Sequence, residues 1–307
     1  MAMVTITDIQ KMKLEEKKIV VMTAYDYSMA SIIDRANVDI LLVGDSGGRN
    51  LLGHEDNNSV TMDEMVLMTR SVSRGAKRAL VIGDMPFMTY QVSKEKALRN
   101  AGRLIQEAGA QAVKLEVGAD YAATVEAVVK AGIPVMAHMG LTPMATIGAA
   151  SYRSGEINLE EENVWRDVDA LVAAGSFSLL LTGVPPNLAK RITEKVKIPT
   201  IAGFGAGDNC DGQIGVTHGV VGFNVWELDK PKAAYGPVGV ALFEAGPQVH
   251  RGRPCRQARP LTPRSVGLRF NNGSIGPLSG LNLVNGSSLS KVDRPIMQRP
   301  ARTEWEV

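Results

Sequence analysis

Short runs of β-branched and aliphatic residues recur along the chain, and several in its first half end in charged residues. The run ILLVGDS contains Asp45, LVIGDMPFM contains Asp84, and AVKLEVGA contains Lys114 and Glu116, while Asp26 ends VVMTAYD. A strand buried on both faces of a parallel sheet has this composition, and the charged residue marks where the strand emerges from the core. Carboxylates gathered at the ends of parallel strands repel one another unless a cation or a substrate lies between them. The pattern therefore predicts a divalent-metal site in an enzyme.

Amphipathic segments, several ending in Ala-Gly, separate these runs, as expected for helices that finish at a glycine. The alternation predicts eight β-units and hence an α/β fold, a (β/α)₈ TIM barrel. An open, doubly wound sheet is the alternative, but the charged strand ends are spread through the series and do not gather at one switch point. The expected strands are 19–26, 39–46, 79–85, 112–117, 133–139, 178–183, 199–205 and 214–221.

The last part of the chain has a different composition from the rest. It is rich in Arg, Pro, Gly, Ser and Asn and has no helical or alternating period. We therefore expect a barrel domain over residues 1–245 and a poorly ordered extension over 246–307, in which a solvated tail is favoured over an arginine-rich binding arm.

Composition narrows the function classes. The chain has 307 residues, 45% hydrophobic and 21% charged, so it can bury a large core as an ordinary globular protein. A net charge of +2 gives no electrostatic argument for binding nucleic acid or an anionic membrane. No run is long and apolar enough for a membrane span, and the N-terminus lacks the apolar stretch of a signal peptide. Two cysteines form no disulfide framework. We expect a cytoplasmic enzyme acting on a small molecule.

The segment KLE places two charges on one side of a strand. Lys114 and Glu116 are two residues apart, so their side chains point the same way. Apolar neighbours indicate that the other face is buried as well, and burying two charges is costly without partners. A bound anion for the lysine and a metal for the glutamate would supply them. His138 ends a strand in VMAHMGLTP and is a candidate catalytic residue, whereas the roles of His54 and His218 are less clear.

The chain resembles the ketopantoate hydroxymethyltransferase (3-methyl-2-oxobutanoate hydroxymethyltransferase) family over about residues 5–222. The similarity rests on family segments in the same order: TAYDYSMA, VGDSGG with GHED, VTMDEM, RGAKRALVIGDMPFMTY, AGAQAVKLEVG, HMGLTP, VPPNLAKRIT and IPTIAGFGAGDNCDGQ. The resemblance implies a (β/α)₈ barrel of the phosphoenolpyruvate-binding superfamily and a homo-oligomer, often a decamer in that family. It also implies a role in pantothenate biosynthesis.

The resemblance also implies site roles. Asp45 and Asp84 match the aspartates that hold Mg²⁺ near the substrate, Glu116 lies in the same metal environment, and Ser46 and Lys114 match residues that bind the keto acid's carboxylate. Mg²⁺ would polarise the 2-oxo group of 3-methyl-2-oxobutanoate and stabilise an enolate. The enolate would take a one-carbon unit from 5,10-methylenetetrahydrofolate, giving ketopantoate. An all-oxygen site suits Mg²⁺ better than zinc.

The chain departs from the family pattern at a catalytic position. Thr182 stands where the family has the glutamate that removes the C3 proton, and a neutral hydroxyl is a poor base near neutral pH. His138 is the nearby titratable candidate to replace it. Other departures are NNSVT in place of TLPVT, Met68 in place of a common histidine, and LTPMATIGAASYRSG. Two alternatives therefore stay open: a divergent aldolase, lyase or C–C hydrolase acting on another α-keto acid, and a catalytically weak ligand-binding paralogue.

Overall fold

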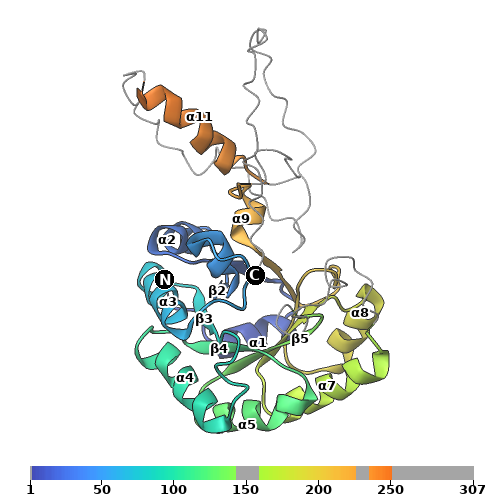
Figure 1. Cartoon of the computed structure of the whole chain (residues 1–307). Helices are drawn as coiled ribbons and strands as arrows, with labels where there is room; N and C mark the ends of the chain where they lie inside the picture. Colours follow the sequence, from blue (N-terminus) through green and yellow to red (C-terminus); the bar gives the residue numbers. More distant parts are fainter. Residues whose placement is uncertain (1, 143–158, 226–234, 251–307) are drawn as a thin grey trace, which may run out of the picture. The chain divides into compact units, whose positions relative to one another are not determined.

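The computed structural model describes residues 2–142, 159–225 and 235–250, and these contain a closed barrel of eight parallel strands (Figure 1). Each strand pairs with the next along the chain, and β1 pairs with β8 to close the barrel. The strands are β1 (Ile19–Thr23), β2 (Ile40–Val43), β3 (Leu80–Asp84), β4 (Ala112–Glu116), β5 (Val135–Gly140), β6 (Ser178–Thr182), β7 (Thr200–Ala202) and β8 (Gly212–Gly215). The predicted fold class is confirmed. The open sheet is excluded, because an open sheet has two unpaired edge strands, whereas here β1 and β8 pair with each other.

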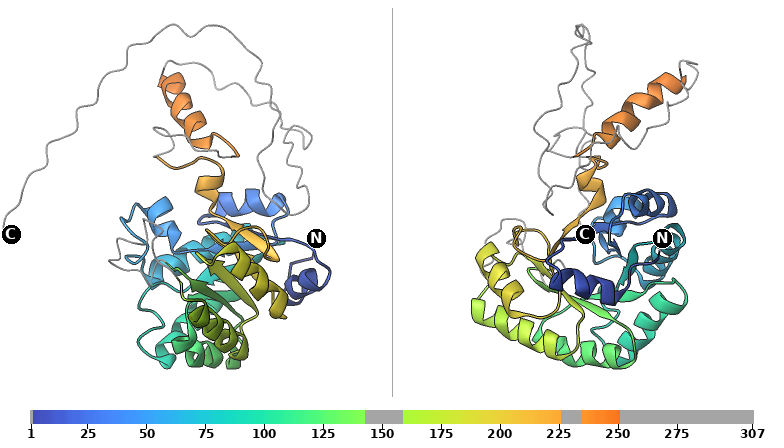
Figure 2. Two further views of the ribbon diagram at one scale, coloured as in Figure 1. Left: turned by 90° about the vertical axis from the view of Figure 1, so that its right-hand side faces the viewer. Right: turned by 180° about the vertical axis from the view of Figure 1, so that it is seen from behind.

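Helices surround the barrel on its outside (Figure 1). They are α2 (Tyr27–Arg35), α3 (Met62–Gly75), α4 (Lys94–Gln106), α5 (Ala122–Lys130), α7 (Glu161–Ala173) and α8 (Pro186–Lys195). Helix α1 (Ile6–Leu14) precedes β1 and lies across one end of the barrel (Figure 2). The helices α9 (Thr217–Val220) and α11 (Val238–His250) follow β8. A π-helical turn η1 (Gly48–Leu52) follows β2, and a 3₁₀ turn η2 (Ala119–Tyr121) follows β4. Within these described ranges, no helix combines the length and apolar character needed to cross a bilayer.

The strands bury both faces, and each face has its own apolar cluster. Residues at alternate positions of the strands fill the barrel interior, and Ile9 of α1 packs with them. The interior cluster is Ile9, Ile19, Val21, Ile40, Leu42, Leu80, Ile82, Ala112, Met136, Phe177, Leu180 and Ile201. The other faces pack against the surrounding helices through a larger cluster that includes Leu41, Val43, Val81 and Leu115. This arrangement explains why the strand sequences are continuously apolar.

One expected strand differs from the structure, and the expected domain boundary stays a prediction. The eighth strand was expected over 214–221, but β8 ends at Gly215 and the following apolar residues form α9. Thr217 donates its backbone N–H to Thr23 Oγ1 at 3.0 Å, which turns the chain at the end of the strand. A short apolar run does not by itself distinguish a strand from a buried helix. In addition, α11 runs through the domain boundary that we placed after residue 245, and the rest of the predicted extension, 251–307, lies outside the described residues.

Candidate active site

The charged residues of the site continue the inward-facing rows of the barrel. Asp84 follows Leu80 and Ile82 at alternate positions of β3, and on β4 the row is Ala112, Lys114 and Glu116. His138 follows Met136 on β5, and Thr182 follows Leu180 on β6. The carboxyl ends of parallel strands meet at one mouth, which is where barrel enzymes place their catalytic groups. The expectation that Lys114 and Glu116 share one buried face is confirmed, since they are 3% and 7% exposed.

Lys114 is the centre of this polar cluster. Its Nζ lies 3.0 Å from Asp84 Oδ2, 3.3 Å from Glu116 Oε1 and 3.2 Å from His138 Nδ1. An ammonium group has three N–H donors and can satisfy three such acceptors. Lys114 therefore compensates the buried negative charge that β3 and β4 bring together.

Asp45 joins the cluster from the loop after β2. Its backbone N–H donates to Asp84 Oδ2 at 3.0 Å, and its Oδ1 accepts from Asn57 Nδ2 at 3.2 Å. Within the described part of the chain, neither Asp45 Oδ2 nor Asp84 Oδ1 has a hydrogen-bond partner, although both atoms are buried. Two unsatisfied carboxylate oxygens are costly in a protein interior unless a cation takes them as ligands. Mg²⁺ fits them, because it is commonly held by one or two carboxylates with water and substrate completing its octahedron.

Glu116 has a different environment from the two aspartates. Its Oε1 lies 3.2 Å from His138 Nδ1 as well as close to Lys114. Among the described residues, no three His, Cys, Asp or Glu side chains are arranged as a metal-binding group. The structure thus brings Asp45 and Asp84 together with spare oxygens, while Glu116 contacts the lysine and the histidine.

Burial and mutual repulsion perturb the ionisation of these groups. Burial is the main cause that raises the pKa of Asp84 to about 6, against the opposing effect of Lys114. Burial, followed by the charge of Asp84, raises the pKa of Asp45 well above its ordinary value. Burial alone would lower the pKa of Lys114, but the charges of Asp84 and Glu116 outweigh it and raise that pKa. Burial and the charge of Lys114 lower the pKa of His138, which favours the neutral imidazole. Perturbed groups gathered at a barrel mouth are characteristic of an active site.

Thr182, for which the sequence predicted a departure from the family pattern, lies beside His138. Its Oγ1 is 2.8 Å from His138 Nε2, so the ring connects the hydroxyl on one side to Glu116 and Lys114 on the other. Gly203, at the end of β7, leaves space for this side chain: a Cβ there would meet Thr182 Oγ1 at 2.3 Å. Two tautomers satisfy the ring. Either Nδ1 accepts from Lys114 and Nε2–H donates to Thr182, or Nδ1–H donates to Glu116 and Nε2 accepts from Thr182.

Ser46 lies at the mouth next to Asp45 and is held by residues that the sequence did not reveal. Its Oγ is 2.8 Å from the hydroxyl of Tyr25, which also accepts from Asn50 Nδ2 at 3.3 Å. Met68, at the position of the family's common histidine, is buried against Gly47, where a Cβ would lie 2.7 Å from its Sδ. Tyr25 lies in the loop after β1 and Asn50 in η1 after β2. Their approach to Ser46 depends on how the ends of β1 and β2 meet, for which the sequence carries no periodic signal.

Other candidate residues have structural roles. Asp26 was grouped with the strand-end carboxylates, but it caps α2 and accepts from the Met29 backbone N–H at 2.8 Å. His54 Nε2 lies 2.9 Å from Glu64 Oε1. His218 is stacked against Phe223, with 5.1 Å between the ring centroids.

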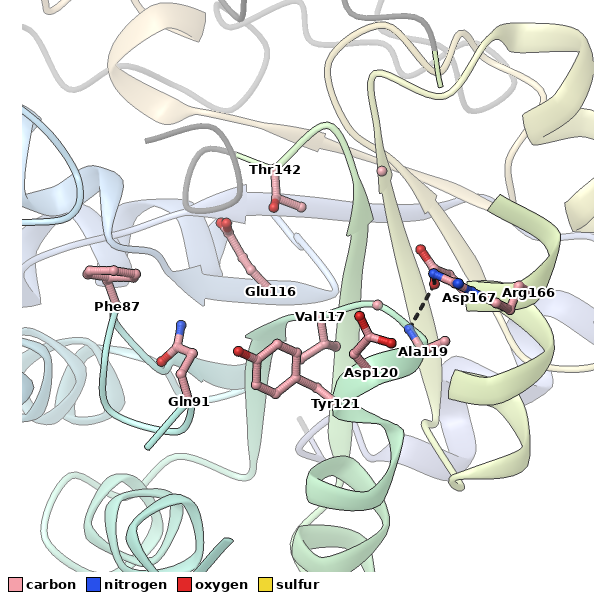
Figure 3. Close-up of a pocket in the computed structure, with 12 residues that line it drawn as sticks. Phe87, Gln91, Glu116, Val117, Ala119, Asp120, Tyr121, Thr142, Arg166 and Asp167 are labelled. Atoms are coloured by element: carbon pink, nitrogen blue, oxygen red, sulfur yellow. Dashed lines mark hydrogen bonds and ion pairs between the residues drawn. The ribbon is translucent and has the colours of Figure 1, made fainter. Parts of the chain in front are cut away.

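A cavity of about 310 Å³ adjoins the cluster at the ends of β4 and β5 (Figure 3). Aromatic and amide side chains line one part of it, and an exposed arginine lines another: Phe87, Gln91, Tyr121 and Arg166. Glu116 and Thr142 also line it and, in the view of Figure 3, lie between Phe87 and Arg166. Asp167 on α7 accepts from the Ala119 backbone N–H at 2.8 Å, which fixes the loop after β4. The volume and the mixed lining are those of a small-molecule site.

Solved structures share the fold of this chain. The chain superposes on 2,3-dimethylmalate lyase, described as a PEP mutase/isocitrate lyase superfamily member, with a TM-score of 0.59 at 19% identity, covering 87% of this chain and 94% of that one. It also superposes on phosphonopyruvate hydrolase, solved with oxalate and Mg²⁺, with a TM-score of 0.59 at 14% identity, covering 86% of this chain and 94% of that one. The fold is the α/β barrel found in that superfamily.

Sequence comparison identifies the family within this class. The profile of the ketopantoate hydroxymethyltransferase family matches residues 3–245. The 3-methyl-2-oxobutanoate hydroxymethyltransferase of Pelobacter propionicus is 50% identical over 219 residues, which is 71% of this chain and 81% of that protein. That of Chloroflexus aurantiacus is 45% identical over 242 residues, 79% of this chain and 85% of that protein. The chain belongs to the ketopantoate hydroxymethyltransferase family.

Proposed function

We propose that the protein transfers a one-carbon unit from 5,10-methylenetetrahydrofolate to 3-methyl-2-oxobutanoate, giving ketopantoate in pantothenate biosynthesis. Family membership with relatives of 45% to 50% identity supports the reaction. The observation that supports the site is the pair of buried, unsatisfied carboxylate oxygens of Asp45 and Asp84 beside Lys114. They lie at the carboxyl ends of β2 and β3, the end of the barrel where an α-keto acid would bind.

Asp45 and Asp84 would hold Mg²⁺ through the two oxygens that lack protein partners. When bound, the ion supplies Lewis-acid polarisation of the substrate's 2-oxo group and so acidifies the C3 proton. Glu116, 3.3 Å from Lys114, would keep the lysine in place and complete the polar surround of the metal. Lys114 would also favour metal binding by Asp45 and Asp84, because its positive charge stabilises their ionised forms, and these are the forms that bind a cation.

Ser46 and Lys114 would bind the keto acid's carboxylate. The Ser46 hydroxyl can donate to an anion while its oxygen accepts from Tyr25, whose O–H lies 2.8 Å away. A carboxylate reaching Lys114 would exchange with one of its present acceptors, and His138 Nδ1 is the neutral one among them. Two donors, one in the turn after β2 and one on β4, would then fix the orientation of the substrate.

The cavity beside Glu116 would receive the folate co-substrate. Its aromatic residues Phe87 and Tyr121 can pack against a flat ring system, and the amide of Gln91 can pair with polar atoms at the edge of the ring. Arg166 can pair with a carboxylate of the co-substrate's tail. A ligand placed in this way would bring its one-carbon unit close to Glu116 and Thr142, next to the keto acid.

The C3 proton requires an acceptor, and Thr182 offers none by itself. We place this role on His138, directly or through the Thr182 hydroxyl 2.8 Å from its Nε2. In the tautomer with Nδ1–H donated to Glu116, Nε2 accepts from the Thr182 hydroxyl. The hydroxyl oxygen would take the C3 proton as its own proton passes to Nε2. This arrangement is the histidine–carboxylate pairing by which proteins orient a general base.

Proton exchange tests this proposal before any folate is added. Purified protein, Mg²⁺ and 3-methyl-2-oxobutanoate are incubated in D₂O, and loss of the C3 proton signal is followed by NMR. We expect exchange that requires Mg²⁺ and is lost in Asp84→Asn, with full turnover on adding 5,10-methylenetetrahydrofolate. Absence of exchange, together with cleavage of another α-keto acid in a substrate panel, would instead assign the divergent aldolase, lyase or C–C hydrolase activity. Binding without either reaction would indicate a ligand-binding paralogue.

Two further expectations from the family stay predictions. We infer a cytoplasmic enzyme that assembles as a homo-oligomer, with a decamer as the assembly to test. Sedimentation velocity of the purified protein measures its mass against the 32.9 kDa of one chain, so a monomer would contradict the inference directly.

A further inference from the structure

The loop between η1 and α3 is held at both ends by one residue. Glu64, in the first turn of α3, lies 2.9 Å from His54 Nε2 through its Oε1. Its Oε2 accepts from the backbone N–H of Thr61 at 2.8 Å, while Thr61 Oγ1 in turn accepts from the Glu64 backbone N–H in a capping box. Residues 54 and 61 are therefore fixed relative to α3, and the segment between them forms a strap of defined position.

A further turn stiffens this strap at its centre. The carboxylate of Asp56 accepts from the backbone N–H and from the hydroxyl of Ser59, at 2.9 Å and 2.8 Å. The turn encloses Asn57 and Asn58. Asn57 is partly buried, and its Nδ2 reaches 3.2 Å from Asp45 Oδ1. The sequence separation of this contact is small, but it joins two loops that leave different elements.

The hydrogen bond gives the two oxygens of Asp45 different environments. Oδ1 accepts from Asn57, whereas Oδ2 is buried and has no hydrogen-bond partner within the described residues. A carboxylate held at one oxygen cannot rotate freely, so the other oxygen keeps a constant direction. Asn57 also donates to the ionised form of Asp45, which opposes the repulsion from Asp84.

We propose that Asn57 is a positioning residue that directs Asp45 Oδ2 toward the divalent metal. This inference rests on the proposed function, because it takes Asp45 as a metal ligand. Outer-shell partners of ligating carboxylates typically change metal affinity by about 10- to 100-fold when they are removed. The chain reads NNSVT where the family usually has TLPVT, so this chain uses an amide where a threonine is usual.

Metal binding measured without turnover tests the role of Asn57. Mn²⁺, as a paramagnetic probe, is titrated into the full-length protein and free Mn²⁺ is followed by EPR, with Mg²⁺ competition to confirm the site. Four variants are compared with wild type: Asn57→Ala; Asn57→Leu, which keeps the approximate shape without a donor; Asn57→Thr, which restores a shorter donor; and Asn58→Ala. The last is a matched control, because the neighbouring Asn58 has a side-chain oxygen without a hydrogen-bond partner among the described residues. Thermal unfolding is recorded for each.

We expect Mn²⁺ binding to weaken about 10- to 100-fold in Asn57→Ala and Asn57→Leu, to recover partly in Asn57→Thr, and to be unchanged in Asn58→Ala. If Asn57→Ala alone fails to fold, the Mn²⁺ affinity of Asn57→Leu decides the outcome. Wild-type affinity in both donor-free variants would overturn the inference and leave the proposed metal site standing. Equal weakening in Asn58→Ala would also overturn it, because the loop as a whole would then be responsible. Absence of Mn²⁺ binding by the wild type would remove the metal site itself.

Discussion

Replacing Thr182 by glutamate should accelerate the reaction if, as the family resemblance implies, this position is that of the family's general base. Thr182 is 8% exposed, and its hydroxyl fills the space that the missing side chain of Gly203 leaves. A glutamate extends about 2.5 Å beyond the threonine hydroxyl, past His138 and toward the substrate at the mouth. Nearby Glu116 would raise the pKa of the new carboxyl group, and a raised pKa improves a base that works near neutral pH.

The expected gain follows from the chemistry of a positioned base, which contributes about 10²- to 10⁴-fold. We expect kcat of Thr182→Glu to rise by an amount near the lower end of this range, since Asn57 of NNSVT, which contacts Asp45, is a second expected departure from the family sequence. The KM for 3-methyl-2-oxobutanoate should change much less, because the carboxylate-binding residues are untouched. The assay is steady-state turnover with 5,10-methylenetetrahydrofolate, together with C3 exchange in D₂O.

Thr182→Gln is the matched control, since glutamine has the length of glutamate without a basic carboxylate. Thr182→Val removes the hydroxyl that contacts His138 and should lower the wild-type exchange rate. A glutamate variant no faster than the glutamine variant would refute the reasoning. So would a wild-type kcat of the order of 1–10³ s⁻¹, usual for enzymes, that Thr182→Val leaves unchanged, because the proton would then leave by a route that does not involve this position.

Three further predictions concern the folding of the barrel around the site. Lys114→Met leaves Asp84 and Glu116 buried without their cation, so we expect the free energy of unfolding in urea to fall by about 3–5 kcal/mol; an unchanged midpoint would show that the lysine is dispensable for folding. Asp34 accepts from the backbone N–H groups of Lys77, Arg78 and Ala79. Burial would raise its pKa, but these bonds outweigh burial and lower it. Asp34→Asn should therefore cost about 1.5–3 kcal/mol at neutral pH, and this difference from wild type should vanish as the pH falls below about 4, through the folded pKa; a pH-independent difference would contradict the assignment. Asp211 Oδ2 lies 2.7 Å from Lys13 Nζ and accepts from the Thr200 backbone N–H at 2.8 Å. Asp211→Ala should therefore lower the free energy of unfolding, measured by urea denaturation, by about 1.5–3 kcal/mol. The Mn²⁺ affinity of this variant should stay at the wild-type value, because Asp211 precedes β8 and so lies at the end of the barrel opposite the mouth.

The sequence by itself determined the barrel fold, the family, and which strand residues face the barrel interior. A strand alternates its faces with a period of two, so the direction of Lys114 and Glu116 relative to the apolar residues of β4 follows from local geometry alone. The alternation of apolar runs with amphipathic segments is also a local property, and it predicted the order of elements that closes into eight parallel strands. The family segments carried the site roles that the residues alone did not specify.

Only the tertiary structure decided which charges meet. Asp84 lies beside Lys114 because β3 and β4 pair in a particular register, and the loop after β2 brings Asp45 onto Asp84. Asp26 looked equivalent in sequence, yet it caps a helix, because the strand before it ends at Thr23 and the chain turns outward. The contact of Asn57 with Asp45 lies between two loops without periodicity. Contacts between residues on different elements depend on strand register and loop path, and both are set by how the whole barrel closes and packs; a local sequence pattern contains neither.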